Sequence, residues 1–188
     1  MLHALLGCLH PRADLCRSGE RDLQLFLMAL ALAATDPPAE PMSVEVIRDP
    51  ITDHVRAYAT VRARRDRLVV SCDSDEGSQP ELAFHSERWL ARGNVFTGYR
   101  PVTYRFDTRR PRRQMWRVDD RHVALTGQAR IASFLAYLMA SDSLVIRTRD
   151  IENHRVDVTF RLIEVRPAVE QVMSACSGRP WSADELQP

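Results

Sequence analysis

The sequence predicts a single α+β domain: a mainly antiparallel β-sheet or sandwich with two packed helices, tied by a disulfide bond. Three observations lead to this fold class. From residue 44 onwards, most of the chain consists of short stretches with the alternating periodicity of β-strands. Two stretches, 128–140 and 165–176, instead repeat apolar residues at helical spacing. Two cysteines, Cys72 and Cys176, lie towards opposite ends of this series. Strands followed by a helix, a hairpin and a helix are typical of an antiparallel sheet with helices packed on it.

Length and composition place the chain among soluble globular proteins. Its 188 residues suffice for one domain with its own core, and 45% of them are hydrophobic and 27% charged. The formal net charge of +1 provides no overall field that would favour nucleic acid or an anionic membrane. All 26 basic residues are arginine. This bias has two explanations, a GC-rich genome or selection for bidentate contacts with anions.

The first 41 residues are predicted to be a signal peptide and a proline-rich linker. Residues 23–34 form an apolar run of about a dozen residues, too short to span a bilayer but suited to a signal-peptide core. Ala31 and Ala33 supply the small residues that a signal peptidase requires. The prolines within 35–41 favour an extended linker. An over-extended start site would explain the long segment before the run. The alternatives are an ordinary buried helix or a start at Met42.

The first half of the domain reads as strands joined by turns. Residues 55–64 alternate, with small or apolar side chains on one face: Val55, Ala57, Ala59, Val61 and Ala63. Arg65 and Asp66 indicate a tight turn into a strand over 67–72. The turn formers of 73–80 predict a loop. Residues 81–91 then read as a further strand, whose larger apolar residues are Leu82, Phe84 and Trp89.

The second half combines strands with the two helices. Strands are expected over 102–107, 114–118 and 123–125, and a hairpin joins 144–149 to 156–162 through a turn at 150–155. In the helix 128–140 the residues on the apolar face are Ile131, Phe134, Leu135 and Leu138. Pro167 suits the first turn of the last helix, and Gly178 its end. Residues 42–178 therefore form one domain, with 179–188 as a C-terminal tail.

The two cysteines of this domain are predicted to form a disulfide bond. Cys72 closes a strand, and Cys176 lies on the apolar face of the last helix, so both should point into the same core. The other two cysteines, Cys8 and Cys16, precede the expected cleavage site. Within the mature chain Cys72 and Cys176 therefore have only each other as partners. A cytosolic protein would hold two buried thiols in their place.

The sequence contains little that indicates catalysis, and we predict no catalytic residue, no metal site and no cofactor. It has no phosphate-binding glycine loop, no Cys-x-x-Cys pair and no His-Glu-x-x-His motif. The domain's histidines lie on separate segments without ligand spacing: His54, His85, His122 and His154. Asp49 and Asp53 flank a predicted turn. Acid–base chemistry is one interpretation of this pair, and hydrogen bonding to backbone N–H groups is the simpler one.

The densest basic segment, residues 105–117, is the candidate anion-binding site. Its arginines alternate with aromatic residues, a pattern that can bind phosphates and stack bases: Arg105, Arg109, Arg110, Arg112 and Arg113. Pro111 in its middle predicts the tip of a hairpin. Nucleic acid, another anion such as a lipid head group, cell-wall polymer or protein carboxylate, and a solvated turn without a ligand all remain open. Trp116 on the returning strand is predicted to be buried in the core.

The order of these motifs resembles a known family. Asp49-Pro-Ile-Thr-Asp53 and an alternating strand are followed by Leu68-Val-Val-Ser-Cys72. After Val102-Thr-Tyr-Arg-Phe-Asp107, Trp116 and an amphipathic helix, a strand ending in Thr159-Phe-Arg-Leu162 leads to a helix that ends in Ala175-Cys176. Over residues 44–177 the chain is similar to the VasI/TagO-like proteins. That resemblance implies an accessory protein of type VI secretion, or one of the related exported or phage-encoded domains, without enzymatic activity.

Together these features predict an exported, non-enzymatic binding protein, an accessory of a cell-envelope or type VI-like secretion assembly. Its expected location is the periplasm or outside the cell, and its expected partner is an envelope protein or an anionic polymer rather than nucleic acid or a small-molecule cofactor. The alternative is a cytosolic or phage-type regulator that starts at Met42. Such a regulator would bind nucleic acid or another polyanion through the arginine hairpin.

Overall fold

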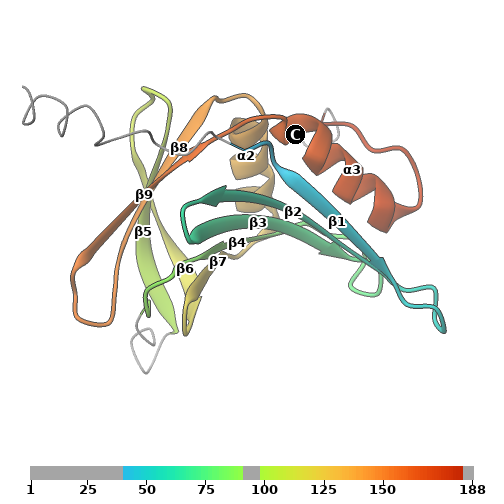
Figure 1. Ribbon diagram of the computed structural model, residues 1–188, viewed down its shortest axis with the longest axis horizontal. Helices are drawn as coiled ribbons and strands as arrows, with labels where there is room; N and C mark the ends of the chain where they lie inside the picture. Colours follow the sequence, from blue (N-terminus) through green and yellow to red (C-terminus); the bar gives the residue numbers. More distant parts are fainter. Residues whose placement is uncertain (1–39, 91–97, 184–188) are drawn as a thin grey trace, which may run out of the picture. The chain divides into compact units, whose positions relative to one another are not determined.

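A computed structural model of the chain describes residues 40–90 and 98–183. The predicted signal peptide and the predicted linker lie outside the described residues, except for Glu40 and Pro41 at the end of the linker. Nine strands form one antiparallel sheet in the order β1-β2-β3-β4-β7-β6-β5-β8-β9 (Figure 1). The strands are β1 (Ser43–Arg48), β2 (Val55–Ala63), β3 (Asp66–Asp73), β4 (Glu81–His85), β5 (Tyr99–Phe106), β6 (Arg112–Asp119), β7 (His122–Leu125), β8 (Ser143–Arg149) and β9 (Arg155–Arg161). The helices are α2 (Gln128–Met139) and α3 (Val165–Ser177). The predicted α+β class is confirmed.

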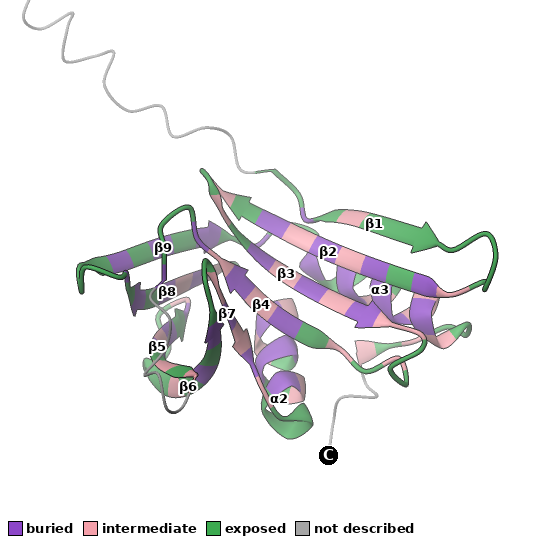
Figure 2. Cartoon of the chain, turned by 90° about the horizontal axis from the view of Figure 1, so that it is seen from below, coloured by how far each residue is buried: buried purple, intermediate pink, exposed green. Residues whose placement is uncertain are grey.

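The sheet curls, so that one face encloses the core together with both helices (Figure 2). Phe84 of β4 and Phe160 of β9 meet edge to face with ring centroids 6.1 Å apart, although several strands separate β4 from β9 in the sheet order. Buried residues alternate with exposed ones along the strands, as a sheet with one solvated face requires. We call the face that carries the helices the inner face and the opposite one the outer face.

Helix α3 covers β1, β2 and β3. The inner residues of β2 are those that the sequence pattern predicted, and Ala57 and Ala59 are fully buried. Such short side chains let a helix lie close to the strand backbone. On α3, the buried face consists of Val165, Ala168, Val169, Val172, Met173 and Cys176. Gly178 ends the helix with φ 67°, a left-handed conformation that glycine adopts without a steric penalty.

Helix α2 covers β5 and β6 through an aromatic cluster. Phe134 lies 4.9 Å from Tyr104, 5.0 Å from Phe106 and 5.7 Å from Trp116, measured between ring centroids. Trp116 is fully buried, which confirms that it belongs to the core. Centroid separations of 4.5–7 Å with inclined ring planes are the favoured aromatic geometry. Large rings thus fill the space between α2 and this part of the sheet.

Two boundaries differ from the expectations. The strand predicted over 81–91 ends at His85, because the chain turns at the following residues, where the Glu87 N–H donates to Asp66 Oδ1 at 3.0 Å. Trp89 is consequently 51% exposed, and the Arg121 guanidinium lies 4.3 Å from its ring centroid. The predicted tail does not leave the domain at residue 179. Trp181 packs against the core, and its N–H donates to the Ser174 hydroxyl at 3.0 Å.

Candidate functional site

The predicted disulfide bond is present. It joins Cys72 at the end of β3 to Cys176 near the end of α3, with the Cα atoms 6.2 Å apart and a sequence separation of 104. Both cysteines are buried. Beside the bond, the Ser78 hydroxyl donates a hydrogen bond of 2.9 Å to the Cys176 carbonyl. The loop after β3 is thereby held to the same end of α3.

Asp49 and Asp53 serve the turn between β1 and β2. Asp49 Oδ1 accepts hydrogen bonds from the N–H groups of Ile51 at 2.7 Å and Thr52 at 3.0 Å. These bonds lower the pKa of Asp49 below its ordinary value. Asp53 adopts a left-handed conformation with φ 57° and faces Arg48 at 3.5 Å. The pair therefore satisfies backbone donors and supports the hairpin, which is the simpler of the two interpretations.

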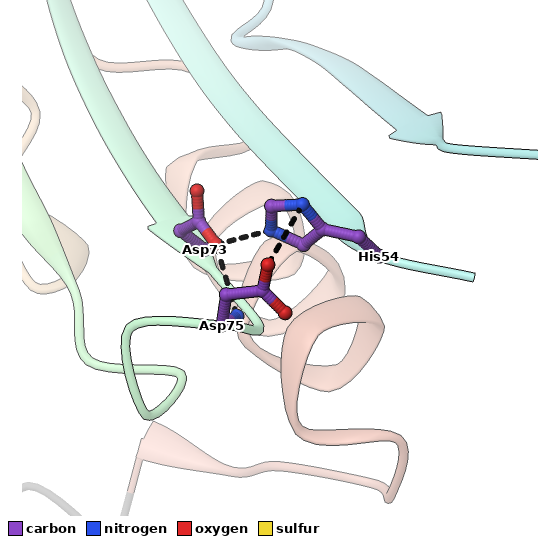
Figure 3. Close-up of side chains that lie close together, drawn as sticks. All are labelled: His54, Asp73 and Asp75. Atoms are coloured by element: carbon purple, nitrogen blue, oxygen red, sulfur yellow. Dashed lines mark hydrogen bonds and ion pairs between the residues drawn. The ribbon is translucent and has the colours of Figure 1, made fainter. Parts of the chain in front are cut away.

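A polar cluster that the sequence analysis missed lies where β2 begins and β3 ends (Figure 3). The His54 ring is largely buried, its Nε2 faces Asp73 Oδ1, and its Nδ1 lies 3.2 Å from Asp75 Oδ2. Arg56 Nε donates to Asp73 Oδ2 at 3.0 Å. The hydrogen bond from His54 lowers the pKa of Asp73 most, and the Asp75 N–H and Arg56 lower it further, against an opposing effect of partial burial.

His54, Asp73 and Asp75 offer ligand atoms within 4.8 Å of one another, the spacing of a metal site. However, the two ring nitrogens face different carboxylates, and one ion can bind only one of these nitrogens. Arg56 also occupies the second oxygen of Asp73. A ring that hydrogen-bonds a carboxylate through each of its nitrogens fits the arrangement better. We therefore interpret the cluster as an ionic clamp that holds β2, β3 and the following loop next to the disulfide bond.

Hairpin register was the signal that could have revealed this clamp. The turn consists of Arg64 and Arg65, one residue earlier than expected, because Ala63 pairs with Asp66. Each step back along β2 is matched by one step forward along β3, so this register places His54 opposite Asp75. A histidine and two aspartates that are distant in sequence thus become neighbours.

Two further histidines meet on the outer face. His85 of β4 pairs with His122 of β7, and their rings stack with centroids 5.1 Å apart. Burial, together with smaller electrostatic effects of Arg67 and His122, lowers the pKa of His85 to about 4. The ring of His85 is therefore neutral near pH 7. In the sequence these two histidines lie on separate segments, and the pairing of β4 with β7 brings them together.

The structure divides the arginines of the candidate anion-binding hairpin between two faces. Arg109 and Arg112 lie over the ring of Tyr137 on α2, with guanidinium-to-centroid distances of 5.0 and 4.5 Å. Arg112 also donates to the Tyr137 hydroxyl at 2.8 Å. These two arginines therefore pack the hairpin onto α2. Arg110 is exposed at the tip, where Pro111 lies as predicted.

Arg105 and Arg113 instead project from the outer face, because they alternate with the buried residues of β5 and β6. The same alternation directs exposed arginines of three strands to that face: Arg117 of β6, Arg147 and Arg149 of β8, and Arg155 and Arg161 of β9. A sequence window of thirteen residues could not reveal this group, since only the pairing of β5 with β6 and β8 brings its members together.

The comparisons with known proteins identify no relative. No protein-family model, curated protein or solved structure matches the chain. In the part of the chain that the structure describes, no helix combines the length and the apolar character needed to span a membrane.

Proposed function

We propose that the protein is an exported binding domain that serves as an accessory of a cell-envelope or secretion assembly. The observation that carries this proposal is the disulfide bond between Cys72 and Cys176. Disulfide bonds persist in oxidising compartments such as the periplasm and are rare in the cytosol. Export also agrees with the apolar run at residues 23–34 and with the small residues Ala31 and Ala33 near its end.

Binding rather than catalysis is supported by how the polar groups are used. Two groupings with catalytic or metal-binding residue types are the Asp49 turn and the His54 clamp. Asp49 accepts backbone hydrogen bonds, and the ring nitrogens of His54 are engaged by Asp73 and Asp75. Because the Asp49 carboxylate and the His54 ring nitrogens already form these structural contacts, they are not positioned to activate a substrate.

The association with a secretion assembly rests on the resemblance of residues 44–177 to the VasI/TagO-like proteins. The order of strands, hairpin, helix and final cysteine agrees with that resemblance. Proteins of such assemblies act through contacts with other envelope proteins, so we expect a protein partner. This part of the proposal can be tested independently of the compartment.

One experiment tests export, and another tests the assembly. N-terminal sequencing of the protein from its native host should find a mature chain that begins near residue 34, after Ala33. An intact N-terminus or a start at Met42 in a cytosolic fraction would contradict export and favour the regulator. Crosslinking in intact cells with a photoreactive residue at an exposed position should then capture an envelope protein. Capture of cytosolic proteins alone would contradict the accessory role.

A further inference from the structure

We propose that the outer face of β5, β6, β8 and β9 binds an acidic segment of a partner protein. This inference rests on the proposed binding function and adds the surface and the chemistry of the partner. We call this surface the outer arginine face and define it by its exposed arginines: Arg105, Arg113, Arg117, Arg147, Arg149, Arg155 and Arg161.

Strand register arranges these arginines in rows across the sheet. Thr103 of β5 pairs with Arg113 of β6 on one side and with Arg147 of β8 on the other. At a strand spacing of about 4.8 Å, the two arginine Cα atoms are therefore about 10 Å apart. Arg105 lies on the same face two residues along β5, which corresponds to about 7 Å. The Cα atoms of three arginines thus lie around one threonine on the same face, so that one acidic segment can contact more than one of them.

Several of these charges have no acidic partner within the described ranges. No carboxylate there forms an ion pair with Arg105, Arg113 or Arg117. Asp119, the nearest acidic residue along β6, is 69% exposed and is directed at His122, 3.8 Å away. Clustered positive charges repel one another, so a complementary anion would be stabilised here.

The molecule itself shows how such an anion would bind. Arg147 Nε and Nη2 donate to the two carboxylate oxygens of Asp157 at 2.7 and 3.0 Å, and Arg155 Nε approaches the same carboxylate at 3.1 Å. Here an aspartate on a neighbouring strand receives the bidentate fork of an arginine. A carboxylate of a partner can engage Arg105, Arg113 and Arg117 by the same contacts.

The side chains between the arginines favour a protein over a nucleic acid. Three other exposed side chains of β5 and β6 lie among these arginines. Met115 is 47% exposed, Tyr99 is 39% exposed, and Pro101 is also exposed. Tyrosine, methionine and arginine are enriched at protein interfaces, whereas lysine is depleted. Surfaces that bind single-stranded nucleic acid commonly combine positive charge with aromatic rings that stack successive bases. On the described residues of these four strands, Tyr99 is the exposed aromatic side chain.

The test measures binding of fluorescently labelled poly-L-glutamate to the purified, disulfide-bonded full chain at about 50 mM salt. Arg105→Gln, Arg113→Gln and Arg117→Gln are combined in one variant. A matched variant carries Arg62→Gln, Arg67→Gln and Arg130→Gln, three exposed arginines outside this face and outside the 105–117 hairpin, and so removes the same net charge. Three exposed ion pairs, each worth about a twofold to fourfold change in Kd, predict binding weaker by about tenfold to sixtyfold in the first variant. The matched variant should bind nearly as tightly as the wild type.

Equal loss in both variants would overturn the proposal, since it would show attraction to net charge alone. No binding by the wild type would overturn it as well. Single-stranded oligothymidine and phosphatidylglycerol vesicles serve as parallel probes. Tighter binding of either one, lost in the first variant only, would assign the face to nucleic acid or to a membrane and reject the protein partner. These binding measurements use the purified chain. Absence of binding would therefore overturn the outer arginine face without affecting the test of export by N-terminal sequencing.

Discussion

The two halves of the sheet are stabilised in different ways. Under α3, the inner face of β2 carries alanines, and a disulfide bond joins β3 to the helix. Under α2, the inner face of β5 and β6 carries Tyr104, Phe106 and Trp116, which meet Phe134 of the helix. Short side chains bury little apolar area, whereas each aromatic ring buries much more. The disulfide bond thus occurs in the half whose buried side chains are aliphatic and small rather than aromatic.

This difference means that the two halves should respond differently to the environment. The half under α3 depends on an oxidising compartment, since its link is a disulfide bond. It also contains the ionic clamp of His54, Asp73 and Asp75, which depends on pH. The half under α2 depends mainly on apolar contacts, which neither redox state nor moderate acid removes. The predictions below test this contrast, from the largest expected effect to the smallest.

Phe134→Ala should have the largest effect on stability. Phe134 is almost fully buried and contacts three other rings, so its truncation leaves a cavity and removes aromatic contacts. We expect the free energy of unfolding, measured in urea, to fall by about 3–5 kcal/mol. Phe134→Leu, which fills most of the space, should cost clearly less. Equal losses in the two variants would show that the aromatic cluster is not the main support of this half.

Replacing both Cys72 and Cys176 by alanine should have the second-largest effect. Loss of the bond restores freedom to an unfolded loop of 104 residues, and we expect a loss of about 2–4 kcal/mol. Amide exchange should rise mainly in α3 and β1 to β3, while α2, β5 and β6 remain protected. A reductant should destabilise the wild type by the same amount and leave this variant unchanged. A uniform rise in exchange across both halves would refute the contrast.

Asp73→Asn should have the smallest effect, and one that depends on pH. The His54 hydrogen bond lowers the pKa of Asp73 below its ordinary value of 3.8. Because this pKa is lower in the folded state than in the unfolded state, the ionised Asp73 stabilises the fold fully above about pH 4. The stabilisation is lost as the pH falls through the pKa of Asp73 in the folded state. The variant should therefore be less stable than the wild type at pH 7, and the two should converge in acid. A difference that stays constant down to pH 2 would contradict the clamp.

The fold class was predictable because the periodicities are clean. The alternation of 55–64 placed Val55, Ala57, Ala59 and Val61 inside, and the helical spacing of the last segment placed Cys176 in the core with Cys72. A strand end and a helix face that both point inward bring two thiols together without further information. Trp116 was predictable on the same ground, since it alternates with exposed arginines on its strand.

Contacts that depend on strand pairing were not predictable. The His54 clamp required the register of the β2–β3 hairpin, and the outer arginine face required β5 to lie between β6 and β8. Local sequence showed the arginine density of 105–117 but not that Arg109 and Arg112 pack on Tyr137. Trp89 was assigned to a strand because its apolar character suits one. The turn after His85 instead leaves it on the surface, against Arg121.

The state of the two cysteines in the native host tests the central claim most directly. Cells are treated with an alkylating agent before lysis, and the protein is purified without reductant, denatured and digested for mass spectrometry. We predict a linked peptide pair containing Cys72 and Cys176, from a protein located in the periplasm or outside the cell. Recovery of both cysteines as alkylated thiols would contradict the disulfide bond in the native compartment, and with it the exported function.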